Sequence, residues 1–296
     1  ALTLLVAGDA PGARDLLKTY PGPAHIVRAK IADKLSDPQE ALSQRLKYYY
    51  SGGQEPQELL TLLDSLGRAP PARQVAEQLW RAANLDFRSR LAVGRKLAQF
   101  YRDATPPDTS AEIKFLEDAK HLGDAAFLDR LAELQQAIGN ARAALAALRS
   151  RYPVVIPDNK ADIYVTQALS AGESEEALRA ALKANPSALT MATRRRLSEI
   201  MNASAEAEIE NGKLASAKSA AANAGRFQDD ARHHRLLSKI FLLEGDTAPA
   251  FSHLMASLKM SPADPQTNYQ AGKILFDQSR FAEAKPYLQM AYAAKP

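Results

Sequence analysis

The feature that most constrains this chain is a 34-residue repeat within residues 231–296. Ala250 returns as Ala284 and Leu254 returns as Leu288, each displaced by 34 residues. Each copy holds a helical pattern, a break, and a second helical pattern that starts just before the alanine. A single helix pair cannot bury its own apolar face, whereas stacked pairs share a continuous core. The repeat therefore predicts a stack of helix hairpins.

A small residue recurs along the whole chain, about one turn into the second helix of each expected pair. Successive candidates are spaced by 28, 31, 39, 33, 33, 40, 33 and 34 residues, so four of the eight spacings lie within one residue of 34. Prolines and glycines between the expected pairs would end helices and form turns. We predict about nine helix pairs, with these small residues: Ala13, Ala41, Ala72, Ala111, Ala144, Ala177, Ala217, Ala250 and Ala284.

The last two units carry the clearest pattern, in which small residues let two helices approach closely and a leucine fills the groove between them. The last unit has Gly272, Phe281, Ala284, Leu288, Ala291 and Pro296, and the unit before it has Ser238, Ala250, Leu254, Ser257 and Pro262. These residues resemble the tetratricopeptide repeat (TPR) family. The large aromatic that the family usually carries early in the first helix is replaced by His234 in one unit and Asn268 in the other.

The resemblance implies an all-α fold, an α-α superhelix (a TPR-like solenoid) of about nine helix pairs. In that family the superhelix is right-handed and its first helices line the concave face. We expect one continuous superhelix over residues 1–296, with divergent repeats in 1–124, intermediate repeats in 125–230 and two clear repeats in 231–296. Residue 296 completes a repeat without a polar capping helix, so we expect this chain to be a fragment of a longer one.

Helix start and stop signals place the remaining helices. Asp37 followed by Pro38 is a typical helix start, Gly52 and Gly53 mark a stop, and residues 152–157 form an extended linker with a proline near each end. The expected helices cover residues 2–7, 13–20, 24–35, 38–50, 55–66, 71–83, 87–102, 109–122, 125–137, 141–151, 158–171, 173–184, 190–211 and 214–224.

Composition excludes several classes of protein. The chain is 46% hydrophobic and 24% charged, and no apolar run approaches the roughly 18–20 residues that cross a bilayer. We expect membrane contact only through regions outside this chain. There is no cysteine, which removes disulfides, thiolate metal sites and cysteine nucleophiles. The absence of cysteine suits an exported or periplasmic protein, but many cytoplasmic proteins also lack cysteine, so the cytoplasm is the alternative location.

The net charge of +4 is spread unevenly. Residues 1–105 carry 15 Lys and Arg against 11 Asp and Glu, residues 106–193 carry 9 against 12, and residues 194–296 carry 14 against 11. These excesses are far below the dense basic field of a nucleic-acid-binding protein. We therefore do not expect nucleic acid to be the main partner.

The sequence contains no recognisable catalytic motif. It has no HExxH, no glycine-rich phosphate loop and no GxSxG. Asp229 and His233 could meet on one helix face, but the adjacent His233 and His234 project about 100° apart around a helix. We therefore expect them to form a surface pair and not a metal site. The prediction is a non-enzymatic protein with no catalytic residues, no cofactor and no metal.

Two groups of cations on expected first helices are candidates for partner binding. Three arginines are spaced by seven residues, and the C-terminal units carry further cations beside a tyrosine. Arginine near tyrosine suits the recognition of carboxylates or peptides, whereas a solvated helix face is the structural alternative. The candidate residues are Arg88, Arg95, Arg102, Arg232, Arg235, Lys239, Tyr269 and Lys273.

Two further local features have structural explanations beside functional ones. Tyr48, Tyr49 and Tyr50 could pack between repeats or form a recognition patch, and we expect at least one of the three rings to be exposed. Trp80 is expected in the core.

The main functional hypothesis is a scaffold that binds one or more proteins along its superhelical groove. Long divergent TPR arrays without cysteine are similar to the periplasmic part of bacterial exopolysaccharide secretion proteins, which dock polymer-modifying enzymes. That resemblance implies a partner enzyme and a role in biofilm formation. The alternative is a helical-repeat module that contacts an anionic polymer, a polysaccharide or RNA, directly.

Overall fold

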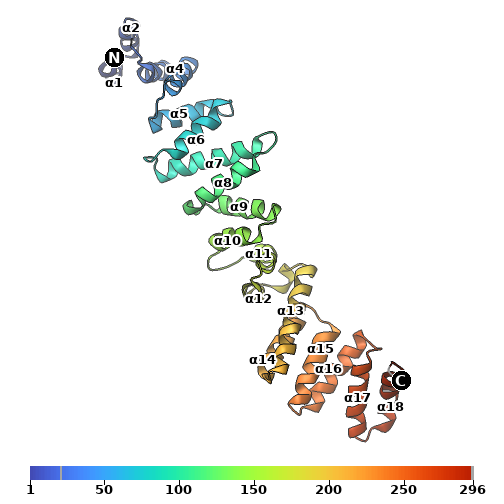
Figure 1. Cartoon of the computed structure of the whole chain (residues 1–296). Coiled ribbons are helices and arrows are strands. Elements are labelled where there is room, and N and C mark those ends of the chain that lie inside the picture. Colours follow the sequence, from blue (N-terminus) through green and yellow to red (C-terminus); the bar gives the residue numbers. More distant parts are fainter. Residues whose placement is uncertain (21, 295–296) are drawn as a thin grey trace. The chain divides into compact units, whose positions relative to one another are not determined.

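A computed structural model describes residues 1–20 and 22–294, and within these residues it contains eighteen α-helices, two short 3-10 helices and no β-strand. Within each of the two compact units described below, the helices follow one another as hairpins, and most consecutive helices pack side by side (Figure 1). The predicted fold class is confirmed, because the chain is an all-α array of TPR-like helix pairs. None of the described helices is long and apolar enough to cross a membrane.

The chain divides into two compact units, residues 1–139 and 140–296. The first unit contains α1 (Leu2–Val6), α2 (Ala10–Lys18), α3 (His25–Lys34), α4 (Pro38–Tyr50), α5 (Pro56–Leu66), α6 (Pro71–Arg81), α7 (Phe87–Asp103), α8 (Thr109–Ala119) and α9 (Ala125–Ala137). The second contains α10 (Ala141–Arg151), α11 (Asp158–Ser170), α12 (Ser174–Lys183), α13 (Met191–Glu210), α14 (Leu214–Phe227), α15 (Ala231–Leu243), α16 (Thr247–Met260), α17 (Pro265–Asp277) and α18 (Phe281–Ala294). That one continuous superhelix joins them stays a prediction.

Short polar side chains start many of these helices. Asp37, Asp86, Asp108, Asn140 and Asp264 each accept a hydrogen bond from the backbone N–H of the third residue that follows. These bonds satisfy donors that have no partner inside the helix. The caps fix where each helix begins, and so which side chains face the neighbouring helix.

The predicted small residues lie at the contacts between helices, with one exception. Eight of them are at most 2% exposed: Ala13, Ala41, Ala72, Ala144, Ala177, Ala217, Ala250 and Ala284. Most of the eight occupy the fourth position after the helix cap. In α8 that position belongs to Glu112, because the cap is Asp108, and Ala111 is only partly buried. The prediction was wrong by one residue there, and a carboxylate takes the place of the alanine.

The last hairpin shows why a small residue is needed in the first helix. A Cβ atom on Gly272 would lie 2.7 Å from Cγ of Leu288 and 3.2 Å from its backbone nitrogen. Glycine therefore lets α17 and α18 approach closely. The equivalent residue 34 positions earlier is Ser238 of α15, another small residue, which is fully buried.

Most predicted boundaries agree with the structure to within three residues. The segment Tyr152–Pro157 contains no strand, as predicted for a linker. The expected helix 109–122 ends as α8 at Ala119 and continues as a 3-10 turn, Lys120–Leu122. A second 3-10 turn, Pro186–Ala188, was not predicted.

A polar network joins α10, α11 and α12. Arg149 donates through Nε to Oε1 of Glu176 at 3.0 Å and through Nη2 to its other oxygen, and the hydroxyl of Tyr164 also donates to Glu176. These hydrogen bonds, that from Arg149 first, hold the pKa of Glu176 below its usual value. Burial, followed by the hydrogen bond to Glu176, raises the pKa of Tyr164 to about 12.

Replacing Glu176 by glutamine is therefore expected to destabilise the second unit at neutral pH and to have less effect in acid. A carboxyl whose pKa is lowered by folding stabilises the folded state above its unfolded pKa, and this contribution is lost as the pH falls through the folded pKa. Urea denaturation of both proteins across the acidic range measures the difference. Glu175→Gln, a change at an exposed position of the same helix turn, is the control. A stability difference that does not depend on pH would contradict the assignment.

Candidate functional site

The three predicted arginines of α7 do not form a free positive stripe. Arg95 pairs with Asp124 at 2.8 Å, before α9, and Arg102 lies 3.9 Å from Glu112 of α8. Arg88 is exposed and makes no ion pair with any described residue. Two of the three guanidinium groups therefore contribute to contacts between helices of the first unit.

The predicted cations of the second unit fall into two classes. Arg232 binds both oxygens of Glu206 on α13, at 3.1 and 2.8 Å, and Arg235 lies 3.6 Å from Asp264 at the start of α17. Lys239 and Lys273 are exposed and make no ion pair within residues 1–20 and 22–294. The arginines link neighbouring helices, and the two lysines remain available to a partner.

The free lysines occupy equivalent positions of successive repeats. Lys273 follows Lys239 by 34 residues, and Tyr269 follows Arg235 by the same distance. Within each first helix the two members are four residues apart, which places them on one face. The structure thus places Arg235, Lys239, Tyr269 and Lys273 in one repeated pattern along α15 and α17. We call these four residues the first-helix surface.

An open groove borders this surface at its C-terminal end. It has a volume of about 680 Å³, and its walls are formed by the start of α17 and by α18. Tyr269 lines it from α17, and Leu288 and Tyr292 line it from α18. The side chain of Tyr269 is 53% exposed, so its ring offers apolar area as well as a hydroxyl. An apolar side chain of a partner would fit here, beside the lysines.

The tyrosine cluster of the first unit has a mixed role. Tyr48 is structural, because its ring packs over Gly53 and its hydroxyl accepts a hydrogen bond from the backbone N–H of Glu55. Tyr50 is exposed, which confirms that at least one ring faces solvent. Tyr49 lines a polar groove of about 770 Å³. The other polar side chains that line this groove are Gln54, Gln74, Glu77, Gln78, Arg81 and Asn84.

Trp80 is partly buried and packs edge-on against Phe115, with ring centroids 4.9 Å apart. Its indole N–H donates to the carboxylate of Asp118 at 2.7 Å. Trp80 therefore packs between helices, close to its expected position in the core.

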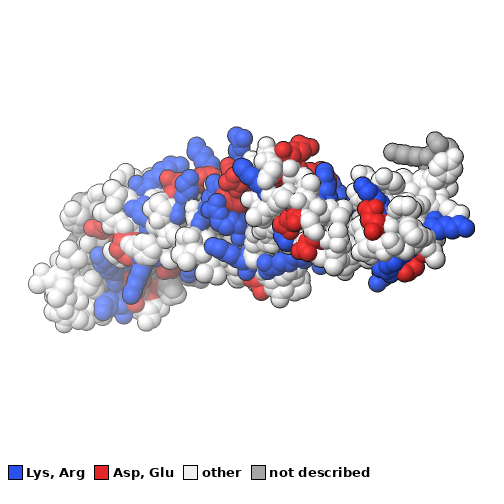
Figure 2. Space-filling model, turned by 90° about the horizontal axis from the view of Figure 1, so that it is seen from below, with Lys and Arg blue, Asp and Glu red and all other residues white. Residues whose placement is uncertain are grey.

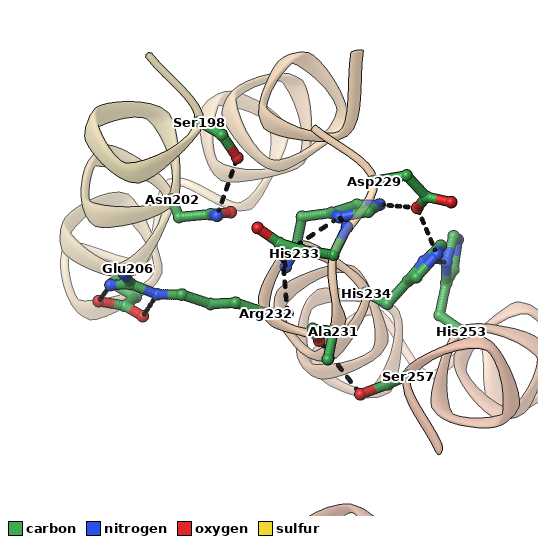
Figure 3. A network of polar contacts seen from close by, with 11 residues as sticks. Ser198, Asn202, Glu206, Asp229, Ala231, Arg232, His233, His234, His253 and Ser257 are labelled. Atoms are coloured by element: carbon green, nitrogen blue, oxygen red, sulfur yellow. Dashed lines mark hydrogen bonds and ion pairs between the residues drawn. The ribbon is translucent and has the colours of Figure 1, made fainter. Parts of the chain in front are cut away.

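The predicted contact between Asp229 and His233 near the start of α15 is present, and His234 joins it, which the sequence did not predict. Oδ1 of Asp229 lies 3.0 Å from Nε2 of His234 and 3.3 Å from Nε2 of His233 (Figure 3). Nδ1 of His234 lies 3.0 Å from Nδ1 of His253 on α16. The two rings meet although neighbouring residues of a helix project about 100° apart, because Asp229 precedes α15 and both rings of the first turn can reach it.

The ring nitrogens of this cluster have defined partners. The backbone N–H of Asp230 donates to Nδ1 of His233 at 3.0 Å, as part of a capping box. Burial, and then the neighbouring His233, lower the pKa of His234. Burial and His234 also lower the pKa of His253. Both of these rings are therefore held towards their neutral forms, in which nitrogen lone pairs are available.

Charges of both signs are mixed over the visible surface. Lys and Arg side chains lie between Asp and Glu side chains on the face shown in Figure 2. This view shows no extended region of a single sign, and the ion pairs described above account for part of the mixture. The mixture of signs accords with the small net charge of +4.

Comparisons with known proteins show no family. No family model matches the sequence, and no curated protein matches it. Among solved structures, MamA is 12% identical with a TM-score of 0.32, over 55% of this chain and 93% of that chain. A complex of the TPR2AB domain of yeast Sti1 with an HSP90 peptide is 12% identical with a TM-score of 0.36, over 90% of this chain and 97% of that chain.

The Cut9–Hcn1 hetero-tetramer of the APC/C is 14% identical with a TM-score of 0.31, over 97% of this chain and 57% of that chain. Identities and TM-scores of this size carry no argument about fold or function. The TPR-like repeat fold of this chain follows from its own helix pairs and their 34-residue register.

Proposed function

We propose that this chain is a non-enzymatic scaffold that binds a partner protein through the first-helix surface. The observation that carries the proposal is the repeated pair of side chains, Arg235 with Lys239 and Tyr269 with Lys273, in which both lysines lack an internal partner among the described residues. A segment of a protein that carries carboxylates and an apolar anchor would complement this surface. Its carboxylates would meet the lysines, and its anchor would enter the groove beside Tyr269.

The setting that we propose is a bacterial exopolysaccharide secretion complex in the periplasm, with a polymer-modifying enzyme as the partner. The support is the architectural resemblance of a long, divergent and cysteine-free TPR array to such scaffolds. Direct contact with an anionic polymer is the competing function. Lys239 and Lys273 would contribute to either, but the groove lined by Tyr269 and Leu288 offers an apolar pocket that favours a protein segment.

Photo-crosslinking tests the scaffold function. A photoreactive amino acid in place of Tyr269 is expected to give a discrete crosslinked protein in cells that express the full-length gene. The same substitution at the exposed Ser252 of α16 is the positional control. Lys239→Glu combined with Lys273→Glu should abolish the crosslink, because charge reversal repels acidic partners.

The matched charge control is Arg226→Glu combined with Lys259→Glu, two exposed positions outside the first-helix surface, and it should leave the crosslink unchanged. Crosslinks of equal yield at residues 269 and 252, or a crosslink to a polysaccharide alone, would contradict the proposal. Finding that the full-length gene encodes no export signal would remove the periplasmic setting but not the scaffold function.

A further inference from the structure

We propose that Asp229, His233 and His234 form a binding site for a divalent transition-metal ion of the zinc class. Among the residues that the structure describes, these are the one group of three potential ligands whose ligand atoms all lie within 4.8 Å of one another. The site lies where the loop after α14 enters α15 (Figure 3), and none of its three residues belongs to the first-helix surface. It does not depend on the proposed scaffold function.

The distances fit a shared ion with small adjustments. Zinc binds imidazole nitrogen and carboxylate oxygen at about 2.0–2.2 Å, so two ligands of a tetrahedral ion lie about 3.3–3.5 Å apart. The oxygen of Asp229 is 3.3 Å from Nε2 of His233 and 3.0 Å from Nε2 of His234. Both separations are close to those of a ligand set that surrounds one ion.

The other nitrogen of His234 has a suitable partner, and that of His233 can gain one by a change of tautomer. Metal-binding histidines usually hydrogen-bond through their second nitrogen to a carboxylate or another acceptor, which fixes the ring. Nδ1 of His234 lies 3.0 Å from Nδ1 of His253, and Nδ1 of His233 lies 3.5 Å from Oδ1 of Asp230. Asp230 and His253 would thus orient the two ligand rings.

Metal binding requires a change of tautomer at His233. Without metal, Nδ1 of His233 accepts the backbone N–H of Asp230, so the proton of the neutral ring is on Nε2. When Nε2 binds the ion, the ring proton must be on Nδ1, where it can be donated to the carboxylate of Asp230. The hydrogen bond from the backbone N–H of Asp230 to Nδ1 is then replaced by a hydrogen bond from Nδ1–H to the carboxylate of Asp230. The imidazole keeps one proton throughout.

The cluster has more polar groups than helix capping requires. The capping box uses only Asp230 and His233. It does not explain why Asp229 faces two imidazole rings or why His253 reaches across from α16. His233 is 4% exposed and packs against Gly225 of α14, where a Cβ atom would lie 2.7 Å from Nε2 of the ring. The site is therefore held in place by three neighbouring segments.

The ligand types select the metal class. Two imidazoles and one carboxylate suit zinc, cobalt, nickel or copper, whereas calcium and magnesium prefer oxygen ligands. The side chain of Asp229 is 67% exposed, so the fourth position of a tetrahedral ion would face solvent. An open position of this kind can bind water or a ligand from another molecule.

Calorimetric titration of the EDTA-treated full chain with Zn²⁺, and absorption spectroscopy with Co²⁺, test the site. We expect one ion per chain and a Co²⁺ spectrum typical of tetrahedral N/O coordination. Asp229→Asn and His234→Gln should each weaken binding by at least about 10-fold, because each removes a metal ligand. His121→Gln, at an exposed histidine of the first unit, is the matched control and should bind as the unaltered chain does.

Variants behind the ligands provide an independent check. His253→Gln and Asp230→Asn are expected to weaken binding by about 10- to 100-fold without removing a ligand. Asp229 is largely exposed, so Asp229→Asn should keep the circular dichroism spectrum of the parent and separate ligand loss from unfolding. Absence of saturable Zn²⁺ binding, equal affinity in Asp229→Asn, or an equal loss in His121→Gln would overturn the proposal.

Discussion

Replacing Arg130 by methionine is expected to lower the free energy of unfolding of the first unit by about 2–3 kcal/mol, because it leaves a buried carboxylate without its main partner. Glu112 is 1% exposed, and Arg130 of α9 donates to both of its oxygens at 3.0 Å. The remaining cation, Arg102, lies 3.9 Å away. About a third of the Arg130 side chain is exposed, which keeps the expected loss below the upper values for fully buried pairs.

The fluorescence of Trp80, the one tryptophan of the chain, reports this loss during urea denaturation. Trp80 packs on Phe115, one turn after Glu112, so it follows the unfolding of the same region. Arg68→Met, which removes an exposed pair with Asp103, is the control and should cost no more than about 1 kcal/mol.

The double variant Arg130→Met with Glu112→Met is expected to recover most of the loss. Replacing both members of a buried pair by apolar side chains removes the uncompensated charge as well as the pair. A double variant as unstable as Arg130→Met alone would show that the arginine acts through packing and not through the carboxylate.

Leu254→Ala is expected to destabilise the second unit by about 3 kcal/mol, since it removes a fully buried leucine and leaves a cavity. Leu254 of α16 forms a core cluster with Leu258, Ala271 and Ile274, and so joins α16 to α17. Its loss weakens both the hairpin and the contact with the next one, and in a repeat array such contacts between neighbours supply much of the stability.

The repeat provides the control for this variant. Leu288 is the equivalent residue of the last hairpin and is only partly buried, so Leu288→Ala should have a smaller effect, about 1 kcal/mol. Urea denaturation followed by far-ultraviolet circular dichroism gives both values. Trp80 lies in the other unit, so circular dichroism and not tryptophan fluorescence is the measurement for this pair of variants. Equal effects of the two substitutions would contradict the assignment of Leu254 to the core cluster.

Much of the fold could be predicted because its signals are local. The predicted bounds of α4, α9 and α10 agree with the structure to the residue, since each helix begins just after a capping Asp or Asn and stops at a glycine or before a proline. The register of α8 could not be predicted. From the sequence alone Glu112 is expected to be exposed, because a buried carboxylate needs a partner. That partner, Arg130, lies on a different helix, 18 residues later.

The candidate sites were harder to predict for the same reason. Several cations that were predicted to face solvent are bound to carboxylates on other helices. Arg232 and its partner Glu206, for example, are 26 residues apart in the sequence. Lys239 and Lys273 kept their predicted exposure because the repeat itself specifies their position. The contact between Asp229 and His233 was predicted, but that of His234 was missed, because the angle of about 100° between neighbouring residues does not apply to Asp229, which lies before the helix starts.

The pairs made by Arg232 and Arg235 have a mechanical consequence. A partner that offers a carboxylate to Arg232 must compete with Glu206, and one that engages Arg235 must compete with Asp264. Binding of a partner at the first-helix surface and the contacts between neighbouring hairpins would then be thermodynamically linked, because both use the same arginines. Binding of an acidic partner would then weaken the ion pairs that join α15 to α13 and to the start of α17.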